Sequence, residues 1–322
     1  MRTICWSLTL GLSLVLTGTV HAQFEPKEKP HGIRLDKEVT QHWRVGVRIS
    51  AVGGPCAGLR GTIPVPSEWP EQKVRIVNEE ISPLVRQVSY RNVSGIRQML
   101  FVIPQLPAGQ VVTALVTFEI TRSTILAPEH PEQFRIPKEV PVEVRPYLGP
   151  SPGIDARQTQ IRNKAKEIVE GKEGAWKQIE TLYNWVRENV KLQPGDYKGA
   201  LPALTAKTGS RDDLTALFIA LCRAHGVPAR TVFVMDGCYA EFYLEEAERK
   251  GCWFPCQVAG TREFGSLSEP RPVLQKGDNI KVPEESKPQR FVAEILTGHG
   301  RRGAAGGRPQ VEFVRDVVPA KR

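Results

Sequence analysis

Six cysteines and six histidines are the side chains of this 322-residue chain that could carry out covalent chemistry. A cysteine thiolate attacks an acyl carbon most readily when an imidazole beside it accepts the proton. Cys222 and His225 have a spacing that places both side chains on one face of a helix. They lie at the C-terminal end of an apolar run, where the helix dipole disfavours a thiolate, so the pattern favours Cys222 as a buried core residue.

Two further cysteines, Cys252 and Cys256, lie four residues apart in a run that favours a strand. In an extended chain this spacing separates the two residues by about 13 Å, which is too far for both thiolates to bind one Zn²⁺ ion. We therefore predict no metal site and no cofactor.

The N-terminus has the pattern of a secretory signal peptide. Met1-Arg2-Thr3 precedes an apolar run, and Val20-His21-Ala22 places small residues before a cleavage point that follows Ala22. We predict a signal peptide over residues 1–22 and an exported protein, periplasmic or extracellular; a single-pass anchor is the alternative. No other segment reaches the roughly 18 apolar residues of a membrane-spanning helix, so we expect no integral membrane segment after cleavage.

The composition is that of a globular protein with a basic surplus. Apolar residues make up 40% of the chain, which excludes a disordered polymer, and Lys and Arg outnumber Asp and Glu by 44 to 35. Much of the surplus lies in residues 271–322, around the glycine- and arginine-rich segment at 298–303. Such a segment could contact an anionic envelope polymer, and a solvated loop is the favoured alternative. Basic and aromatic residues do not alternate as in a nucleic-acid groove, so we expect no nucleic-acid partner.

Short runs of alternating apolar and polar residues fill the region from residue 41 to residue 128. Trp43–Ile49, Lys73–Val77 and Val111–Ile120 are examples, and turn residues separate them. This pattern predicts an antiparallel β-sandwich domain over 41–128, preceded by a polar linker over 23–40. The region carries few residues that could do chemistry, so we interpret it as a binding or spacer module.

After a proline-rich segment the apolar period becomes helical, and residues 150–262 are predicted to form an α+β domain. Asp155 is placed to cap a helix that ends near Glu170, and a second helix follows Gly174.

A third helix is predicted from its local capping residues. Ser210 followed three residues later by Asp213 is a capping box, which makes Arg211 the first helical residue. Gly226 and Pro228 end the helix. Three strands are expected to follow, over 229–235, 238–244 and 252–258. Residues 263–322 are predicted to be a basic, Pro/Gly-rich extension with short edge strands at 290–295 and 311–314.

The segment Leu217–Arg230, which ends in Gly-Val-Pro-Ala-Arg, resembles the transglutaminase-like superfamily. Tyr239–Tyr243 is similar to the family's His-containing strand, and Trp253-Phe254-Pro255 to its Asp-containing strand. The resemblance covers roughly residues 155–260. It implies a papain-like α+β unit, in which a helix packs on an antiparallel sheet and a Cys-His-Asp triad lies where they meet.

Carried over to this chain, all three triad positions are substituted. The nucleophile position is Arg211, the general-base position is Gly237, and the position of the orienting acid is Gln257. A guanidinium stays protonated and glycine has no side chain that could accept a proton. Loss of such a triad lowers the rate of a hydrolase by about 10⁶, or about 8 kcal/mol of barrier. The resemblance therefore implies a degenerate triad and no covalent acyl transfer.

The resemblance also implies a strand register. If position 237 faces position 257, Cys238 faces Cys256, and both side chains point away from the catalytic face. In an oxidising compartment the pair could form a cross-strand disulfide worth roughly 3 kcal/mol. Two reduced core cysteines are the equally favoured alternative.

Taken together, the residues favour an exported, catalytically inactive transglutaminase-like protein that acts as a binding or scaffold module in the cell envelope. Its expected partner is a peptide, an envelope protein or an anionic polymer, and Arg211 could bind a carboxylate. The alternative is an active peptidase, amidase or protein-crosslinking acyltransferase with a non-standard site. A structural envelope component in which the sandwich provides adhesion is a third hypothesis.

Overall fold

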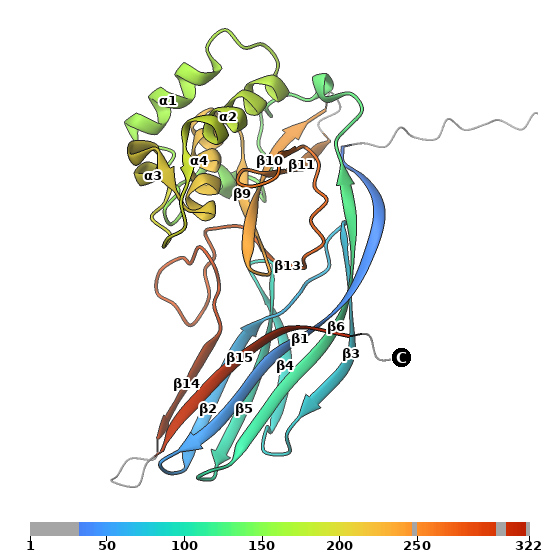
Figure 1. Ribbon diagram of the computed structural model, residues 1–322, viewed down its shortest axis with the longest axis vertical. Coiled ribbons are helices and arrows are strands. Elements are labelled where there is room, and N and C mark those ends of the chain that lie inside the picture. Colours follow the sequence, from blue (N-terminus) through green and yellow to red (C-terminus); the bar gives the residue numbers. More distant parts are fainter. Residues whose placement is uncertain (1–31, 247–249, 301–306, 320–322) are drawn as a thin grey trace, which may run out of the picture. The chain divides into compact units, whose positions relative to one another are not determined.

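The computed structural model describes residues 32–246, 250–300 and 307–319. The predicted signal peptide lies outside these residues, as do residues 23–31 of the predicted linker. Within the described ranges, no helix is both long and apolar enough to cross a membrane. The described residues form three antiparallel sheets of four or five strands, and four α-helices follow one another between residues 159 and 224 (Figure 1).

Two four-stranded sheets form the predicted β-sandwich. One sheet has the order β15-β1-β6-β3 and the other β14-β2-β5-β4. Alternate residues along the strands, such as Val45, Val47 and Ile49 of β1, are buried between the sheets. The fold class predicted from alternation is thus confirmed for this part of the chain. The strands are β1 (Arg34–Val52), β2 (Cys56–Pro64), β3 (Gln72–Ile81), β4 (Gln87–Val93), β5 (Ile96–Leu106), β6 (Val111–Leu126), β14 (Ile295–Gly300) and β15 (Arg308–Val318).

Two boundaries predicted from the sequence are wrong. Residues 34–40 are not linker, because β1 begins at Arg34 and pairs with β6 from there. The C-terminal residues are not an appendage: β15 pairs with β1 along eleven residues of each strand, and β14 pairs with β2. Both strands come from the predicted extension and complete the sandwich, although residues 290–294, expected as strand, are irregular.

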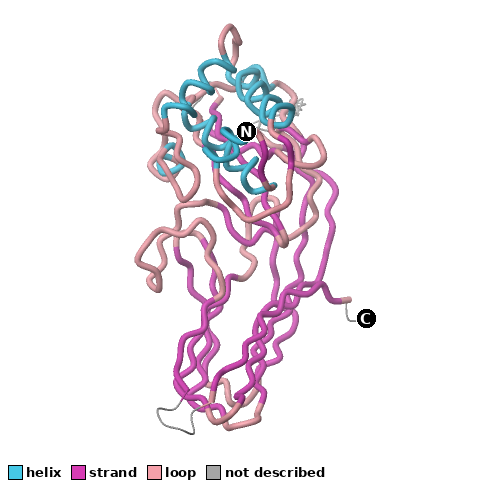
Figure 2. Tube along the Cα trace, turned by 60° about the vertical axis from the view of Figure 1, so that its left-hand side comes forward, coloured by secondary structure: helices cyan, strands magenta, loops and turns pink. Residues whose placement is uncertain are grey.

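The helices lie between the sandwich strands in the sequence and cover one face of a third sheet (Figure 2). That sheet has the order β12-β11-β10-β9-β13. Its strands are β9 (Ala229–Val234), β10 (Gly237–Glu245), β11 (Gly251–Gln257), β12 (Glu263–Phe264) and β13 (Val273–Lys276), so the three predicted strands are confirmed to within a few residues. The helices are α1 (Thr159–Val169), α2 (Ala175–Asn189), α3 (Ala200–Ala206) and α4 (Arg211–Ala224), with short 3₁₀ turns η1 (Pro131–Gln133) and η2 (Arg145–Leu148) before them.

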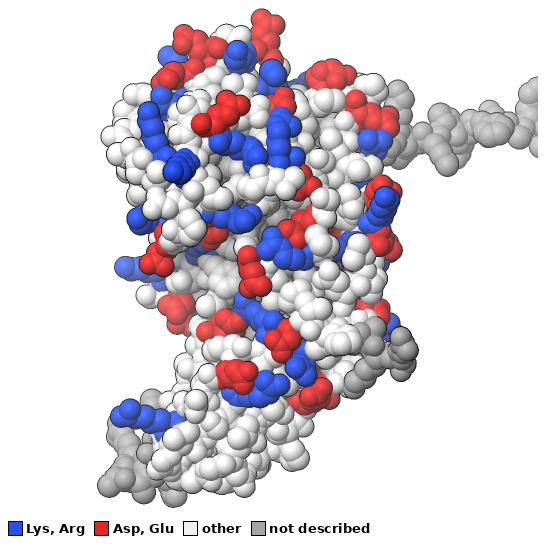
Figure 3. Space-filling view, in the orientation of Figure 1, with Lys and Arg blue, Asp and Glu red and all other residues white. Residues whose placement is uncertain are grey.

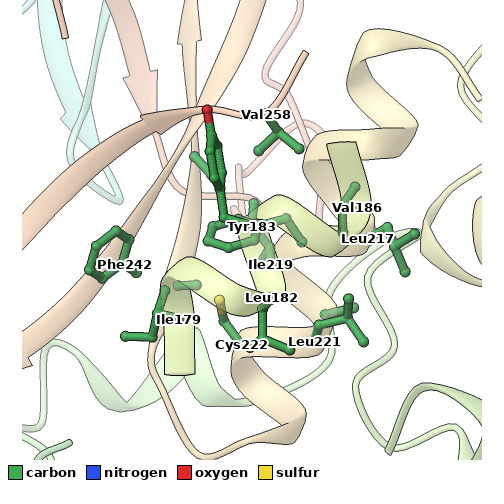
Figure 4. Close-up of a cluster of buried hydrophobic side chains, with 14 of the residues drawn as sticks. Ile179, Leu182, Tyr183, Val186, Leu217, Ile219, Leu221, Cys222, Phe242 and Val258 are labelled. Carbon is green, nitrogen blue, oxygen red and sulfur yellow. The ribbon is translucent and has the colours of Figure 1, made fainter. Parts of the chain in front are cut away.

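Helix α4 is central to this α+β part. All its residues from Asp213 to Arg223 are buried, because α1, α2 and α3 pack on one side and β9 and β10 on the other. Ile179, Leu182 and Tyr183 of α2 meet Leu217, Ile219 and Cys222 of α4 in the core (Figure 4). A helix that is buried on all sides is expected to be apolar around almost its whole circumference.

The helix ends differ from the predictions at one place. Asp155 does not cap a helix: its carboxylate accepts a hydrogen bond from the backbone of Arg157, and α1 begins only at Thr159. Helix α3 was not predicted. It contains Pro202 in its first turn, where a backbone N–H would have no hydrogen-bond partner within the helix, so proline is tolerated there. The two-residue strands β7 (Lys191–Leu192) and β8 (Thr208–Gly209) pair in parallel. β7 follows α2, and β8 directly precedes α4.

Candidate functional site

The N-terminus of α4 is organised by a capping box. The hydroxyl of Ser210 accepts from the backbone N–H of Asp213 at 3.2 Å, and the carboxylate of Asp213 accepts from the backbone N–H of Ser210 at 2.9 Å. The prediction that Ser210 is the N-cap and Arg211 the first helical residue is confirmed. At the other end His225 is the C-cap and Gly226 takes φ = 85°, as predicted for the helix stop.

Asp213 also fixes the loop in front of the helix. Its Oδ1 accepts hydrogen bonds of 2.7 Å from the backbone N–H groups of both Lys198 and Gly199. Burial opposes ionisation of this carboxyl, but the backbone donors outweigh burial and lower its pKa. The loop 193–199 is therefore held against the first turn of α4 by an ionised side chain.

Residues 257–260, which include the last residue of β11 and the three that follow it, form the opposite side of the site and are fixed by α2. The Tyr183 hydroxyl donates to the carbonyl of Gln257 at 2.8 Å, and Arg187 donates to the carbonyls of Val258 and Gly260 at 2.9 and 2.8 Å. These bonds orient the carbonyl of Ala259 toward the N-terminus of α4.

The three predicted site positions lie around that carbonyl. Arg211 Nη1 donates to the oxygen of Ala259 at 3.2 Å, and Gln257 Nε2 donates to the same oxygen at 2.9 Å. A Cβ atom at Gly237 would lie 3.8 Å from Cδ of Arg211. Arg211 thus lies beside Gly237 and shares its hydrogen-bond acceptor with Gln257. None of the three carries a group that can serve as nucleophile or proton acceptor.

An open cleft of about 640 Å³ extends from this point. Its lining is three arginines, two aspartates, three aromatic residues and small or apolar positions: Pro194, Gly195, Tyr197, Ser210, Arg211, Asp212, Phe233, Val234, Asp236, Gly237, Arg290, Phe291 and Arg315. Neither cysteine nor histidine occurs among these lining residues. The size is in the range of ordinary ligand pockets.

Arg290 lines the cleft, although no sequence motif indicates this. It lies on the connection between β13 and β14, and its Nη2 donates to Asp212 Oδ2 at 2.8 Å. Its guanidinium lies 3.9 Å from the ring centre of Tyr197 and 4.9 Å from that of Phe233. This stacked, ion-paired arrangement fixes one wall of the cleft.

The connection that carries Arg290 is itself anchored. Ile280, Val282 and Val292 form a small buried cluster with Ile96 of β5. Gln275 of β13 exchanges two hydrogen bonds with the backbone of Val292, of 2.7 and 2.9 Å. Arg290 and Phe291 therefore enter the cleft from a segment that is bonded on both sides.

The predicted pairing of Cys238 with Cys256 is wrong. Cys256 lies opposite Ala240, so the register of β10 and β11 is two residues away from the expected one. Both thiols are free in the structure, so the disulfide is not formed. Their orientation was also predicted wrongly: Cys256 belongs to the core that contains α4, and Cys238 Sγ donates to Asp212 Oδ1 at 3.3 Å.

The thiols near the cleft are poor nucleophiles. Burial, together with the carboxylate of Asp212, raises the pKa of Cys238 to about 12. Burial likewise raises the pKa values of Cys222 and Cys256. His225 lies at the far end of α4, where its Nε2 is 2.9 Å from Gln178 Oε1 and burial lowers its pKa. Cys222 is buried core, as predicted.

Within the described ranges, no three His, Cys, Asp or Glu side chains are grouped so as to hold a metal ion. The charges on the face shown in Figure 3 are mixed, with Lys and Arg interspersed among Asp and Glu. The local chemistry of the cleft therefore depends on its own arginines and aspartates and on the aromatic rings between them.

Comparison with known proteins agrees with the architecture. The family model of the transglutaminase-like superfamily matches residues 162–258. The crystal structure of a candidate cysteine protease from Cytophaga hutchinsonii is similar in fold, with a TM-score of 0.59 and 13% identity over 90% of this chain and 94% of that chain. A candidate protease from Parabacteroides distasonis is matched at a TM-score of 0.28 and 12% identity over 70% of this chain and 47% of that chain. No curated protein matches the chain.

Proposed function

Because residues 162–258 are a transglutaminase-like domain, we propose that this domain is catalytically inactive and has become a binding module of an exported protein in the cell envelope. The cleft at the start of α4 is the binding site, and a peptide or a segment of an envelope protein is the partner. Export rests on the N-terminal sequence pattern described above.

The observation that carries this proposal is the set of residues that line the cleft. Acyl transfer by a thiol needs a thiolate, a base within hydrogen-bond reach and a group that orients the base. The lining contains neither cysteine nor histidine, and Arg211 lies at the first position of α4. What is left is an open cleft with hydrogen-bond donors and aromatic walls, which suits binding without reaction.

The alternative of an active enzyme would require a nucleophile from elsewhere. Cys238 is the nearest thiol in contact with a lining residue, but its sulfur is buried and donates to Asp212. A buried thiol whose pKa is about 12 supplies thiolate at neutral pH at a level on the order of one molecule in 10⁵. This makes Cys238 a weak candidate.

A test is incubation of the native protein with a fluorescent amine donor plus a glutamine peptide, and separately with a thiol-directed peptidyl electrophile. We expect no amine incorporation and no labelling inside the cleft. The matched control is the triple variant Arg211→Cys/Gly237→His/Gln257→Asp, which restores the three residue types of the triad and should be labelled at position 211. Amine transfer by the wild-type protein, or labelling that maps to Cys238, contradicts the proposal.

A further inference from the structure

Arg211 differs from the other two arginines that line the cleft. Arg290 is ion-paired with Asp212, and Arg315 is ion-paired with Glu294. In the described part of the chain, Arg211 forms no ion pair; its guanidinium donates one hydrogen bond, to the carbonyl of Ala259. A guanidinium has five N–H donors in a planar fork, so most of the binding capacity of Arg211 remains for a ligand.

The hydrogen bond to Ala259 also gives the Arg211 side chain a defined position. The carbonyl is fixed through the bonds that α2 makes to residues 257–260, and Gln257 donates to the same oxygen. The charge of Arg211 is thus held at the end of the cleft where the backbone of α4 begins. The positive end of the helix dipole adds to the attraction for an anion there.

The other walls favour an extended chain over a small ion. Tyr197, Phe233 and Phe291 supply apolar rings, and the Phe233 and Phe291 rings pack edge to face with 5.1 Å between their centres. Pro194 and Gly195 leave the rim without long side chains. A cleft of about 640 Å³ has room for several residues of a peptide.

The two aspartates of the lining decide which anion fits. Asp212 and Asp236 border the same space as Arg211. Their negative charges would repel a doubly charged phosphate more strongly than a singly charged carboxylate. The planar fork of arginine matches a carboxylate through two parallel hydrogen bonds.

We propose that Arg211 is the specificity residue of this cleft and binds the carboxylate of an extended peptide whose neighbouring side chains pack on Tyr197, Phe233 and Phe291. Arg211, at the position where an active relative would carry its nucleophile, thereby recognises a negatively charged group of the ligand. This inference rests on the proposed function, because it assumes that the cleft binds peptides without reacting with them.

The test is a set of three seven-residue peptides, measured by isothermal titration. The first has a central glutamate between apolar residues and blocked ends, the second replaces this glutamate by glutamine, and the third is the glutamine peptide with a free C-terminal carboxylate. We expect the wild-type protein to bind a carboxylate peptide about ten- to hundredfold more tightly than the blocked glutamine peptide. The preferred peptide tells whether the carboxylate comes from a side chain or from a chain end.

Two variants separate Arg211 from general effects. Arg211→Gln should remove the preference for the carboxylate while leaving the affinity for the glutamine peptide unchanged, and inorganic phosphate at the same concentration should not compete. Arg162→Gln, the same substitution at an exposed position of α1, should change nothing.

Each negative outcome has its own meaning. Equal affinity for all three peptides overturns the carboxylate inference but leaves a peptide-binding module standing. Equal loss of both affinities in Arg211→Gln overturns the role of Arg211, and the absence of binding up to millimolar peptide overturns the inference altogether. Cleavage or covalent capture of a peptide overturns the proposed function instead.

Discussion

Helix α4 begins with an arginine, Arg211. The arginine cannot lose its proton at biological pH, and it holds its charge near the positive end of a helix. Gly237 leaves the space beside it free of a base. Gln257 uses its side-chain amide to donate to Ala259 O, the oxygen that also accepts from Arg211. None of these three positions carries a side chain that could act as a nucleophile or accept a proton.

The buried thiols give a prediction at the same scale. Treatment of the native protein with iodoacetamide at pH 7.5 should leave Cys222, Cys238 and Cys256 unmodified for hours, because burial raises the pKa of each. Peptide mapping by mass spectrometry measures the modified fraction of each cysteine. In denaturant without reductant, the same three residues should be modified completely, since all are free thiols in the structure.

The control for this experiment is Arg211→Cys, whose thiol lies in the cleft at the first position of α4. It should react at least about tenfold faster than the buried cysteines, because the helix dipole and exposure favour the thiolate there. Rapid native modification of Cys238 would show that its sulfur is not buried. A fraction of Cys238 and Cys256 that resists modification after denaturation would point to a disulfide.

Helix α4 is the element on which the cleft depends, and its first turn is stabilised by an ionised side chain. Asp213 is 2% exposed and accepts from the backbone of Ser210, Lys198 and Gly199. These bonds join the helix to the loop that forms one rim of the cleft. The pKa of Asp213 is lowered from 3.8, so the folded state prefers the carboxylate.

A dependence on pH follows from this lowered pKa. The contribution of Asp213 to stability is fully present above its unfolded pKa of 3.8 and is lost as the pH falls through the lower folded value. Asp213→Asn should therefore lower the free energy of unfolding by about 1–3 kcal/mol at pH 6, and by less as the pH falls below 3.8. Urea denaturation of the variant and the wild type at a series of pH values measures the difference in free energy of unfolding and its dependence on pH.

Asp196→Asn is the matched control, because Asp196 is exposed in the neighbouring loop. Its stability should follow the wild-type curve at every pH. If Asp213→Asn were as stable as the wild type at pH 6, the carboxylate would not be what holds the loop to α4.

On the scale of the whole molecule, residues from both ends of the chain meet in the sandwich. β1 lies between β6 and β15, and β2 lies between β5 and β14. A buried ion network joins the sandwich strands to the third sheet: Lys276 of β13 lies 2.7 Å from Glu241 of β10 and 2.7 Å from Glu71, and Glu71 is paired with Arg122 of β6. The described strands thus form one connected structure rather than a core with a C-terminal appendage.

Removal of β15 tests this arrangement. A chain that ends at residue 318 should melt like the full chain. A chain that ends at residue 300 leaves one side of β1 unpaired and lacks the buried side chain of Val314, which is 3% exposed. For the shorter chain we expect a decrease in Tm of more than about 10 °C, or aggregation, in a calorimetric scan. Identical melting of the two truncated chains would mean that β15 contributes little to the stability of the sandwich.

Local sequence determined the parts of this protein whose causes are local. Ser210, Asp213 and Gly226 fix the two ends of α4 by bonds within a few residues, and the alternation in segments such as Trp43–Ile49 fixes which face of a strand is buried. The likeness of Leu217–Arg230 to a known superfamily indicated Arg211, Gly237 and Gln257. Arg211 and Gly237 line the cleft, and Gln257 donates to the carbonyl of Ala259 that also accepts from Arg211.

Tertiary structure alone decided the features that join distant residues. The register of β10 and β11 places Cys256 opposite Ala240, two residues away from Cys238. Arg290 enters the cleft from a segment 78 residues beyond Asp212, and β15 pairs with a strand that begins at Arg34. Such contacts depend on how all the elements pack, because the free energy that selects them comes from burial and strand pairing between distant residues. No short segment of the sequence therefore predicts them.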